Sequence, residues 1–243
     1  MANKNVNFAN REVANLMISE YSTKNQFLYV DWANVSSTSF EAERVFATGG
    51  QGAPNRVQFD SQRTGTLTVE AQVYPAKVFQ MLSGNDMATA ADVLKRERLT
   101  ATAEGLTLTE TPVGTSVQVF AADDDCGTPI EASLAAKVVT GDGITENSEY
   151  IVYYFANVTD AMVIKFDANH FPRAYRVEAE VPFKREDDVI VQSRHIWYKC
   201  APQGAFELSW QNTGDPASIT LTFDVMADDQ LRIYDQIFPN VTE

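Results

Sequence analysis

The sequence predicts a mainly β protein: an antiparallel β-sandwich or partial barrel with a short flanking helix, plus an inserted small β-sandwich domain. Apolar and polar residues alternate with period two over several long segments, which is typical of half-buried strands. Clusters of Gly, Asn, Asp and Pro separate these segments, as turns do. The stretch 101–170 differs from its flanks because it is rich in acidic residues and has only Lys137 and Lys165 as bases.

The N-terminal segment Asn10–Ser19 is expected to form a helix, because its apolar residues fall on one stripe at helical spacing. These residues are Val13, Leu16 and Met17. Two strands are expected to follow, over Phe27–Trp32 and Phe40–Phe46, where aromatic and β-branched residues gather.

A polar, glycine-rich loop, Thr48–Arg56, comes next. It contains Gly49, Gly50, Gln51, Gly52 and Asn55. A phosphate-binding loop would need a helix directly after these glycines, and the sequence continues into a strand-like run instead. We therefore expect an interstrand loop and no nucleotide site.

Three long strands are expected to share one apolar face and one polar face. The apolar face is formed by Leu67, Val69, Ala71 and Val73, by Tyr175, Val177, Ala179, Val181 and Phe183, and by Ile219, Leu221, Phe223 and Val225. Strand parity places four carboxylates on the opposite face: Glu70, Glu178, Glu180 and Asp224. Two further strands are expected over Val189–Cys200 and Phe206–Trp210.

Two more short helices are expected. Pro75 can open the first, because its missing N–H is not needed in the first turn of a helix. This helix would run over Ala76–Leu82 and end at Ser83 and Gly84. The second is expected over Ala90–Leu99.

The acidic stretch is expected to be a separate β-sandwich over residues 112–170, inserted into an outer domain formed by residues 1–111 and 171–243. Its expected strands are Ser116–Phe120, Lys137–Thr140, Glu149–Phe155 and Met162–Phe166. Four aromatic residues, Tyr150, Tyr153, Tyr154 and Phe155, could form a glycan-stacking platform, but an alternating strand would bury some of them in the core of the insert.

Charge and hydropathy exclude several classes of function. A net charge of −14 disfavours tight binding of nucleic acid, because like charges repel. The longest apolar run, Ile151–Ala156, is far shorter than the roughly 20 residues of a membrane helix. Met1–Glu20 is too polar for a signal peptide, so synthesis in the cytoplasm is expected.

No catalytic, metal or cofactor site is expected. Asp123, Asp124 and Asp125 lack the alternating ligands of a calcium loop. His195 and Cys200 differ in strand parity and should not meet unless the strand bulges, and we expect His195 to pack on the same face as Trp197.

Two groups of short phrases resemble the tail tube proteins of contractile-tailed bacteriophages. The first comprises Val57–Asp60, Gly65–Glu70 and Tyr74–Gly84, and the second comprises Phe206–Trp210, Gly214–Pro216 and Ile219–Val225. The resemblance covers residues 25–110 and 171–238, and the acidic insert departs from the simplest tube proteins.

The resemblance implies a structural virion protein with no enzymatic activity. Copies would form rings of six that stack into a hollow tail tube for DNA, alongside other tail proteins such as a sheath or baseplate. Glu70, Glu178, Glu180 and Asp224 would then face the lumen, and the loop with Gly49–Gly52 and Asn55 would order between rings. The alternative is a β-rich virion or surface module that recognises a glycan or a protein through the acidic insert.

Overall fold

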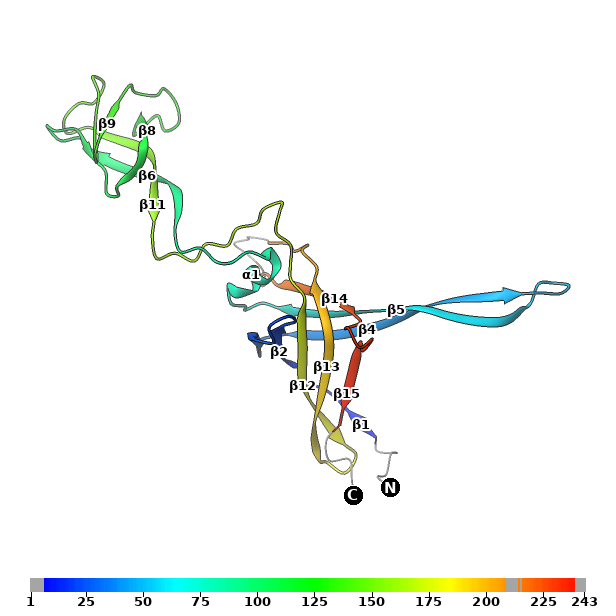
Figure 1. The fold of residues 1–243 in the computed structure, drawn as a ribbon. Coiled ribbons are helices and arrows are strands. Elements are labelled where there is room, and N and C mark those ends of the chain that lie inside the picture. The colour runs from blue at the N-terminus through cyan, green and yellow to red at the C-terminus, as the bar shows by residue number, and fades with distance from the viewer. Residues whose placement is uncertain (1–6, 209–213, 215, 239–243) are drawn as a thin grey trace. The chain divides into compact units, whose positions relative to one another are not determined.

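The computed structural model describes residues 7–208, 214 and 216–238. The chain divides into two compact units, which are considered separately (Figure 1). Unit 1 combines the residues up to Asn85 with those from Phe166 onward, and unit 2 is Asp86–Lys165. Among the described residues, no helix has both the length and the apolar character needed to cross a membrane.

Unit 1 is built on one antiparallel sheet with the strand order β3-β2-β12-β13-β14-β5-β4. Two short strands pair beside this path, β1 with β12 and β15 with β13. The strands are β1 (Phe8–Ala9), β2 (Asn15–Glu20), β3 (Gln26–Val30), β4 (Val35–Thr48), β5 (Asn55–Ala71), β12 (Tyr175–Arg185), β13 (Ile190–Pro202), β14 (Ile219–Met226) and β15 (Tyr234–Ile237).

The sheet folds over on itself at β13, which confirms the expected sandwich-like fold. The middle of β13 pairs with β12 and β15, whereas only Lys199–Pro202 pair with β14. We call β4, β5 and β14 layer A, and β2, β3, β12 and β13 layer B. In Figure 1 the strands of layer B run across those of layer A. A hydrogen bond from Trp197 Nε1 to Thr38 Oγ1 (3.2 Å) crosses between the layers, and Ala14 N, directly before β2, donates to Ser36 Oγ (3.1 Å).

The core lies between the two layers and contains the apolar faces that the sequence predicts. All of the predicted residues of β14 and β5 are buried, as are Tyr175, Val177, Ala179 and Val181 of β12. Phe183 is half-buried at the edge of this core. Val73 lies beyond the end of β5 and is 73% exposed, so the predicted face ends at Ala71.

One helix, α1 (Lys77–Ser83), packs Val78, Met81 and Leu82 into this core, which confirms the helix expected after Pro75. Gly84 ends it in the left-handed conformation (φ 71°) and donates its N–H to the carbonyl of Gln80. A Cβ at Gly84 would lie 2.1 Å from the carbonyl oxygen of Phe171, so the close approach of the two segments also requires glycine.

Two predicted helices are wrong. Asn10–Ser19 contributes instead to β2, in which Leu16 and Ile18 are buried and Met17 between them points away from the core. Ala90–Leu99 lies in strand β6 (Ala91–Thr100), which pairs along its whole length with a strand of unit 2. In both cases a short apolar pattern fits the period of a helix as well as that of a strand. Pairing with a distant segment then decides that the residues form a strand.

Two predicted strands also differ from the structure. Phe206, Glu207 and Leu208 lie outside any strand, and the rest of Phe206–Trp210 lies outside the described residues. In Met162–Phe166, only Val163 forms an isolated bridge, with Ala88.

Unit 2 is a small all-β body made of two three-stranded sheets, ordered β6-β11-β8 and β7-β10-β9. Its remaining strands are β7 (Leu106–Thr107), β8 (Pro112–Ala121), β9 (Ser133–Ala135), β10 (Val138–Thr140) and β11 (Glu149–Val158). The central strand β11 pairs with β6 on one side and β8 on the other, so the compact unit begins at Asp86 rather than at the expected residue 112.

Candidate assembly surfaces

The most unusual surface of unit 1 is a hairpin arm, residues 41–64, in which β4 and β5 continue beyond the core as a two-stranded ribbon (Figure 1). Every residue of β5 before Gly65 is exposed, whereas Leu67, Val69 and Ala71 beyond it are buried. A two-stranded ribbon of this kind is marginally stable by itself in water. Its length therefore suggests that another surface supports it.

The two faces of the arm differ in chemistry. A bulge between Ala42 and Glu43 shifts the register, and beyond it Val45 pairs with Phe59 and Ala47 with Val57. These four residues share one face, and we call them the apolar stripe. Val45, Val57 and Phe59 are 54%, 51% and 59% exposed. Exposed apolar side chains that gather on one face are a common mark of a protein interface.

The opposite face of the arm contains an ion pair. Arg44 Nε donates to Asp60 Oδ1 at 2.7 Å, and Gln58 Nε2 donates to both oxygens of the same carboxylate. The hydrogen bond from Arg44, supported by Gln58, lowers the pKa of Asp60. Phe46 pairs with Gln58 on this face and is 43% exposed, so the face is mixed, whereas the apolar stripe is apolar at all four positions.

The tip of the arm contains the predicted loop. Gly49, Gly50, Gln51 and Gly52 lie in a turn between β4 and β5, and Asn55 is the first residue of β5, paired with Thr48. The turn is closed by hydrogen bonds from Gly49 N to Pro54 O (3.2 Å), from Ala53 N to Gly50 O (3.0 Å) and from Arg56 Nε to Gly49 O (2.8 Å). The loop thus connects two strands, as expected.

The four carboxylates predicted for a lumen all point away from the core, but they lie on different layers. Glu70 and Asp224 lie on layer A, where Glu70 pairs with Thr220 and Asp224 with Thr66. Glu178 and Glu180 lie on layer B, opposite Ile196 and Arg194. Because the two layers enclose a common core, their outward faces look in different directions. The four carboxylates therefore do not share one face of unit 1.

Layer B also contains arginines that pair with these carboxylates. Arg194 lies 2.6 Å from Glu180 and 4.0 Å from Glu178, and Arg176 lies 2.8 Å from Glu178. The ring of Tyr198 is contacted by the guanidinium groups of Arg176 (4.9 Å) and Arg232 (4.0 Å). Arg194 shares a face with Glu180 because the register of β12 and β13 pairs them, and the contribution of Arg232 depends on the pairing of β15.

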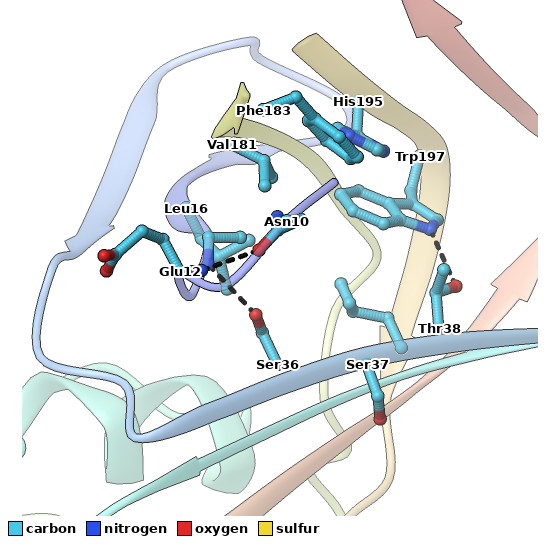
Figure 2. A pocket seen from close by; sticks show the side chains of 12 residues that line it. Asn10, Glu12, Leu16, Ser36, Ser37, Thr38, Val181, Phe183, His195 and Trp197 are labelled. Carbon is cyan, nitrogen blue, oxygen red and sulfur yellow. Dashed lines mark hydrogen bonds between the residues drawn. The ribbon is translucent and has the colours of Figure 1, made fainter. Parts of the chain in front are cut away.

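A cavity of about 240 Å³ opens between the layers near His195 (Figure 2). Its walls include Leu16, Leu67 and Val181, and the rings of His195 and Trp197 stack with centroids 6.0 Å apart. This confirms that His195 packs on the same face as Trp197. Two hydrogen bonds lie along the walls, from Trp197 to Thr38 and from the N–H of Glu12 to Asn10.

His195 makes two hydrogen bonds that suit a neutral ring. The hydroxyl of Ser193 donates its one proton to the carbonyl of Val181 (3.0 Å), so it must accept a proton from His195 Nε2 (3.0 Å). Nδ1 then carries no proton and accepts from the hydroxyl of Tyr234. Burial lowers the pKa of His195.

Cys200 is engaged in packing. The register between β12 and β13 shifts between Tyr175 and Val177, and this bulge brings Cys200 into the same core as Trp197. Burial raises the pKa of the Cys200 thiol to about 12, so the reactive thiolate is disfavoured. The ring nitrogens of His195 bind Ser193 and Tyr234, which leaves no base for a Cys/His pair at this place.

In unit 2 the four aromatic residues of β11 are divided between core and surface, as expected for an alternating strand. Tyr150 and Tyr154 are buried, whereas Phe155 is 48% exposed. Tyr153 belongs to a surface network in which it donates to Asp125 (2.9 Å) and receives a hydrogen bond from Arg96 (3.2 Å). Hydrogen bonds with Cys126 and Asp125 raise the pKa of Tyr153 to about 12.

The acidic turn of unit 2 does not gather ligands for a metal ion. Asp124 binds the backbone N–H of Thr128 (2.9 Å), and Asp125 forms an ion pair with Arg96 (2.7 Å). Over the described part of the chain, no group of three or more His, Cys, Asp or Glu residues is arranged to hold a metal ion.

The arrangement thus combines a long arm that lacks a partner, an unpaired strand edge along β4 and two polar outward faces. Such features suit self-association better than chemistry on a small molecule. None of the curated proteins matches the chain in sequence. A family model, however, matches residues 10–235, which include both units, and on this evidence the chain belongs to the YomU/Tube protein family.

Proposed function

We propose that the chain is the subunit of a bacteriophage tail tube, in which rings of the protein stack into a hollow conduit for DNA. Membership of the tube family supports a phage tube-like structural protein of the virion tail. The finer features belong to the proposal: rings of six, a contractile tail with sheath or baseplate partners, assembly in the host cytoplasm, and no enzymatic activity.

The observation that carries the proposal is the hairpin arm. The apolar stripe, Val45, Ala47, Val57 and Phe59, has no partner within the described chain, and burying it would remove apolar area from water. A second copy of the chain is the partner we propose, because an arm that reaches a neighbour generates a head-to-tail contact, which closes into a ring or continues along a tube.

The free edge of β4 supports the same proposal. Within the described residues, β4 pairs with β5 alone, so the other side of this 14-residue strand is unpaired. Unpaired edges promote association with other strands, and a closed ring of subunits can abolish them. Strands of neighbouring copies would then continue one sheet.

Assembly can be tested directly with the purified full-length protein. We expect rings or tubes by negative-stain electron microscopy, and sedimentation coefficients that rise with concentration. The double variant Val57→Ser/Phe59→Ser should fold normally, because both side chains are already exposed, but should stay monomeric. Gln58→Ser on the opposite face of the same strand is the matched control and should assemble.

Two results would contradict the proposal. One is wild-type protein that remains monomeric over a wide concentration range with no rings or tubes on the grid. The other is a Val57→Ser/Phe59→Ser variant that assembles as readily as the Gln58→Ser control.

A further inference from the structure

The outward face of layer A carries a regular array of hydroxyl groups. Three strands contribute three successive outward positions each, and the strand register aligns them in rows. The rows are Val35–Glu70–Thr220, Ser37–Thr68–Thr222 and Ser39–Thr66–Asp224. Six of the nine side chains are Ser or Thr, and we call these six the hydroxyl array. Within it, Ser39 Oγ lies 2.7 Å from Thr66 Oγ1.

The charges within the nine positions are of one sign. The two charged residues among the nine positions are Glu70 and Asp224. Gln203 donates to Asp224 at 2.9 Å, a neutral contact that leaves the carboxylate charge in place. These nine positions therefore offer hydroxyls and negative charge. Next to them on β13, Lys199 pairs with Met226, and its Nζ lies 5.2 Å from the centre of the Tyr21 ring.

The outward face of layer B has the opposite property. It presents the guanidinium groups of Arg176 and Arg194, each paired with Glu178 or Glu180. Beside them Arg232 stacks on Tyr198 and forms an ion pair with Asp228 (2.7 Å). Guanidinium groups bind phosphates with paired hydrogen bonds, so the phosphates of DNA would compete with these carboxylates for the same donors. A wall of this composition would offer the phosphates guanidinium groups, which the nine positions of layer A lack.

The edges of the two layers differ as well. Layer A ends in β4, a strand of 14 residues with a free side, whereas layer B ends in β3, which has five residues. A continuous wall formed from many copies needs a long edge at which neighbouring sheets can join. Layer A meets this requirement and layer B does not.

We propose that layer A alone lines the channel, with the hydroxyl array, Glu70 and Asp224 facing the DNA, and that Glu178 and Glu180 point away from it. This inference rests on the proposed tube. Hydroxyl groups hold a layer of water and offer no fixed charge to the phosphates. The two carboxylates of each copy repel DNA within about 8 Å of the wall at physiological salt. DNA could then move past the wall without binding to it.

Cysteine accessibility in assembled tubes tests the assignment. The background is Cys126→Ser, because Cys126 is the exposed natural cysteine and Cys200 is fully buried. Thr222→Cys reports on the hydroxyl array, Thr68→Cys is its second probe, and Glu180→Cys is the matched position on layer B. Each variant is treated, before and after assembly, with a small maleimide and with a maleimide attached to a protein too large to enter a tube.

We expect Thr222→Cys to react with both reagents as free subunits but only with the small one in tubes, and Thr68→Cys to behave in the same way. In tubes, Glu180→Cys should not show this pattern of reaction with the small reagent alone. The assignment is overturned if Thr222→Cys in tubes reacts with the large reagent or is closed to both, or if Glu180→Cys shows this pattern instead. If the wild-type protein forms no tubes, the proposed function itself has failed, which is a different result.

Discussion

His195 shows how a single buried side chain can make the stability of unit 1 depend on pH. Both of its ring nitrogens have partners, and the arrangement requires Nδ1 to accept a proton from Tyr234. A second proton on the ring would remove this acceptor and place a charge beside Phe183 and Trp197. Burial makes the charged ring costly in the folded state, so the pKa of His195 lies below its usual value of 6.5.

The first prediction follows from this shift. Below about pH 6.5 the unfolded chain binds a proton at this histidine that the folded chain does not. The stabilisation that neutral His195 contributes to the folded state is therefore fully present above pH 6.5. It decreases as the pH falls towards the folded-state pKa of His195. The slope is at most about 1.4 kcal/mol per pH unit for one proton. We expect urea unfolding at several pH values to show a smaller loss of stability in His195→Gln than in wild type between pH 6.5 and 5. Equal slopes would contradict the account.

The second prediction concerns Gly84, at the end of α1. Gly84→Ala places a methyl group 2.1 Å from the Phe171 carbonyl and forces a left-handed alanine. Gly52→Ala is the control, since Gly52 also has positive φ (84°) but a Cβ there meets nothing within 4 Å. We expect the control to lose about 1 kcal/mol of unfolding free energy and Gly84→Ala to lose more than about 2 kcal/mol. If chemical denaturation shows similar losses for Gly84→Ala and Gly52→Ala, the segment around Phe171 moves away from the added methyl group and the account is wrong.

At the scale of elements, the tip loop can be separated from the fold. Its hydrogen bonds are local, and β4 and β5 pair up to Thr48 and Asn55 without it. The third prediction is that replacing residues 49–54 by Asn-Gly, which suits a two-residue hairpin turn, changes the free energy of unfolding by no more than about 0.5 kcal/mol.

The same shortened variant tests the expected role of the loop in assembly. If the loop orders between rings, the shortened variant should form rings that do not stack, and Gln51→Ala should stack normally. Electron micrographs that show tubes of normal length from the shortened variant would remove the idea.

The elements that sequence could predict are those with one buried face. Leu67 and Val69, or Leu221 and Phe223, alternate with polar residues because β5 and β14 each have a core on one side only, so the pattern is local. For β2 and β6 the same reasoning failed. Leu16 and Ile18 of β2 are buried in the core, yet Met17 completes a convincing helical stripe. The outward residues of β6 are mostly charged, and only its pairing with β11 makes it a strand.

The assembly surfaces were predictable to a smaller degree. The glycines identify the tip loop, and parity places the carboxylates away from the core, because both signals are local. The division of Glu70 and Glu178 between two faces depends on the fold of the sheet at β13, and the apolar stripe depends on the bulge beside Glu43. Both arise from pairing between distant segments, which alternation within one strand does not encode.

At the scale of the whole molecule, the two units are connected at neighbouring positions of unit 1. Asn85 Nδ2 donates to Asp167 Oδ2 at 3.1 Å, just beyond the end of unit 2, and Gly84 lies against Phe171. Each unit also has its own hydrophobic core. Removal of unit 2 should therefore leave a gap in unit 1 that a few residues can bridge.

The fourth prediction compares two deletions bridged by Gly-Ser-Gly. Deletion of residues 86–165 should leave a soluble, folded unit 1 with one cooperative unfolding transition, because no core residue of unit 1 is lost. Deletion of residues 112–169, the boundary expected from composition, should aggregate, because it leaves β6 without β11 and uncovers Leu106 and Leu108. Size-exclusion chromatography and circular dichroism distinguish the two. Insoluble protein from the first deletion would mean that unit 1 depends on unit 2, and equal solubility of both would mean that β6 does not need its partner.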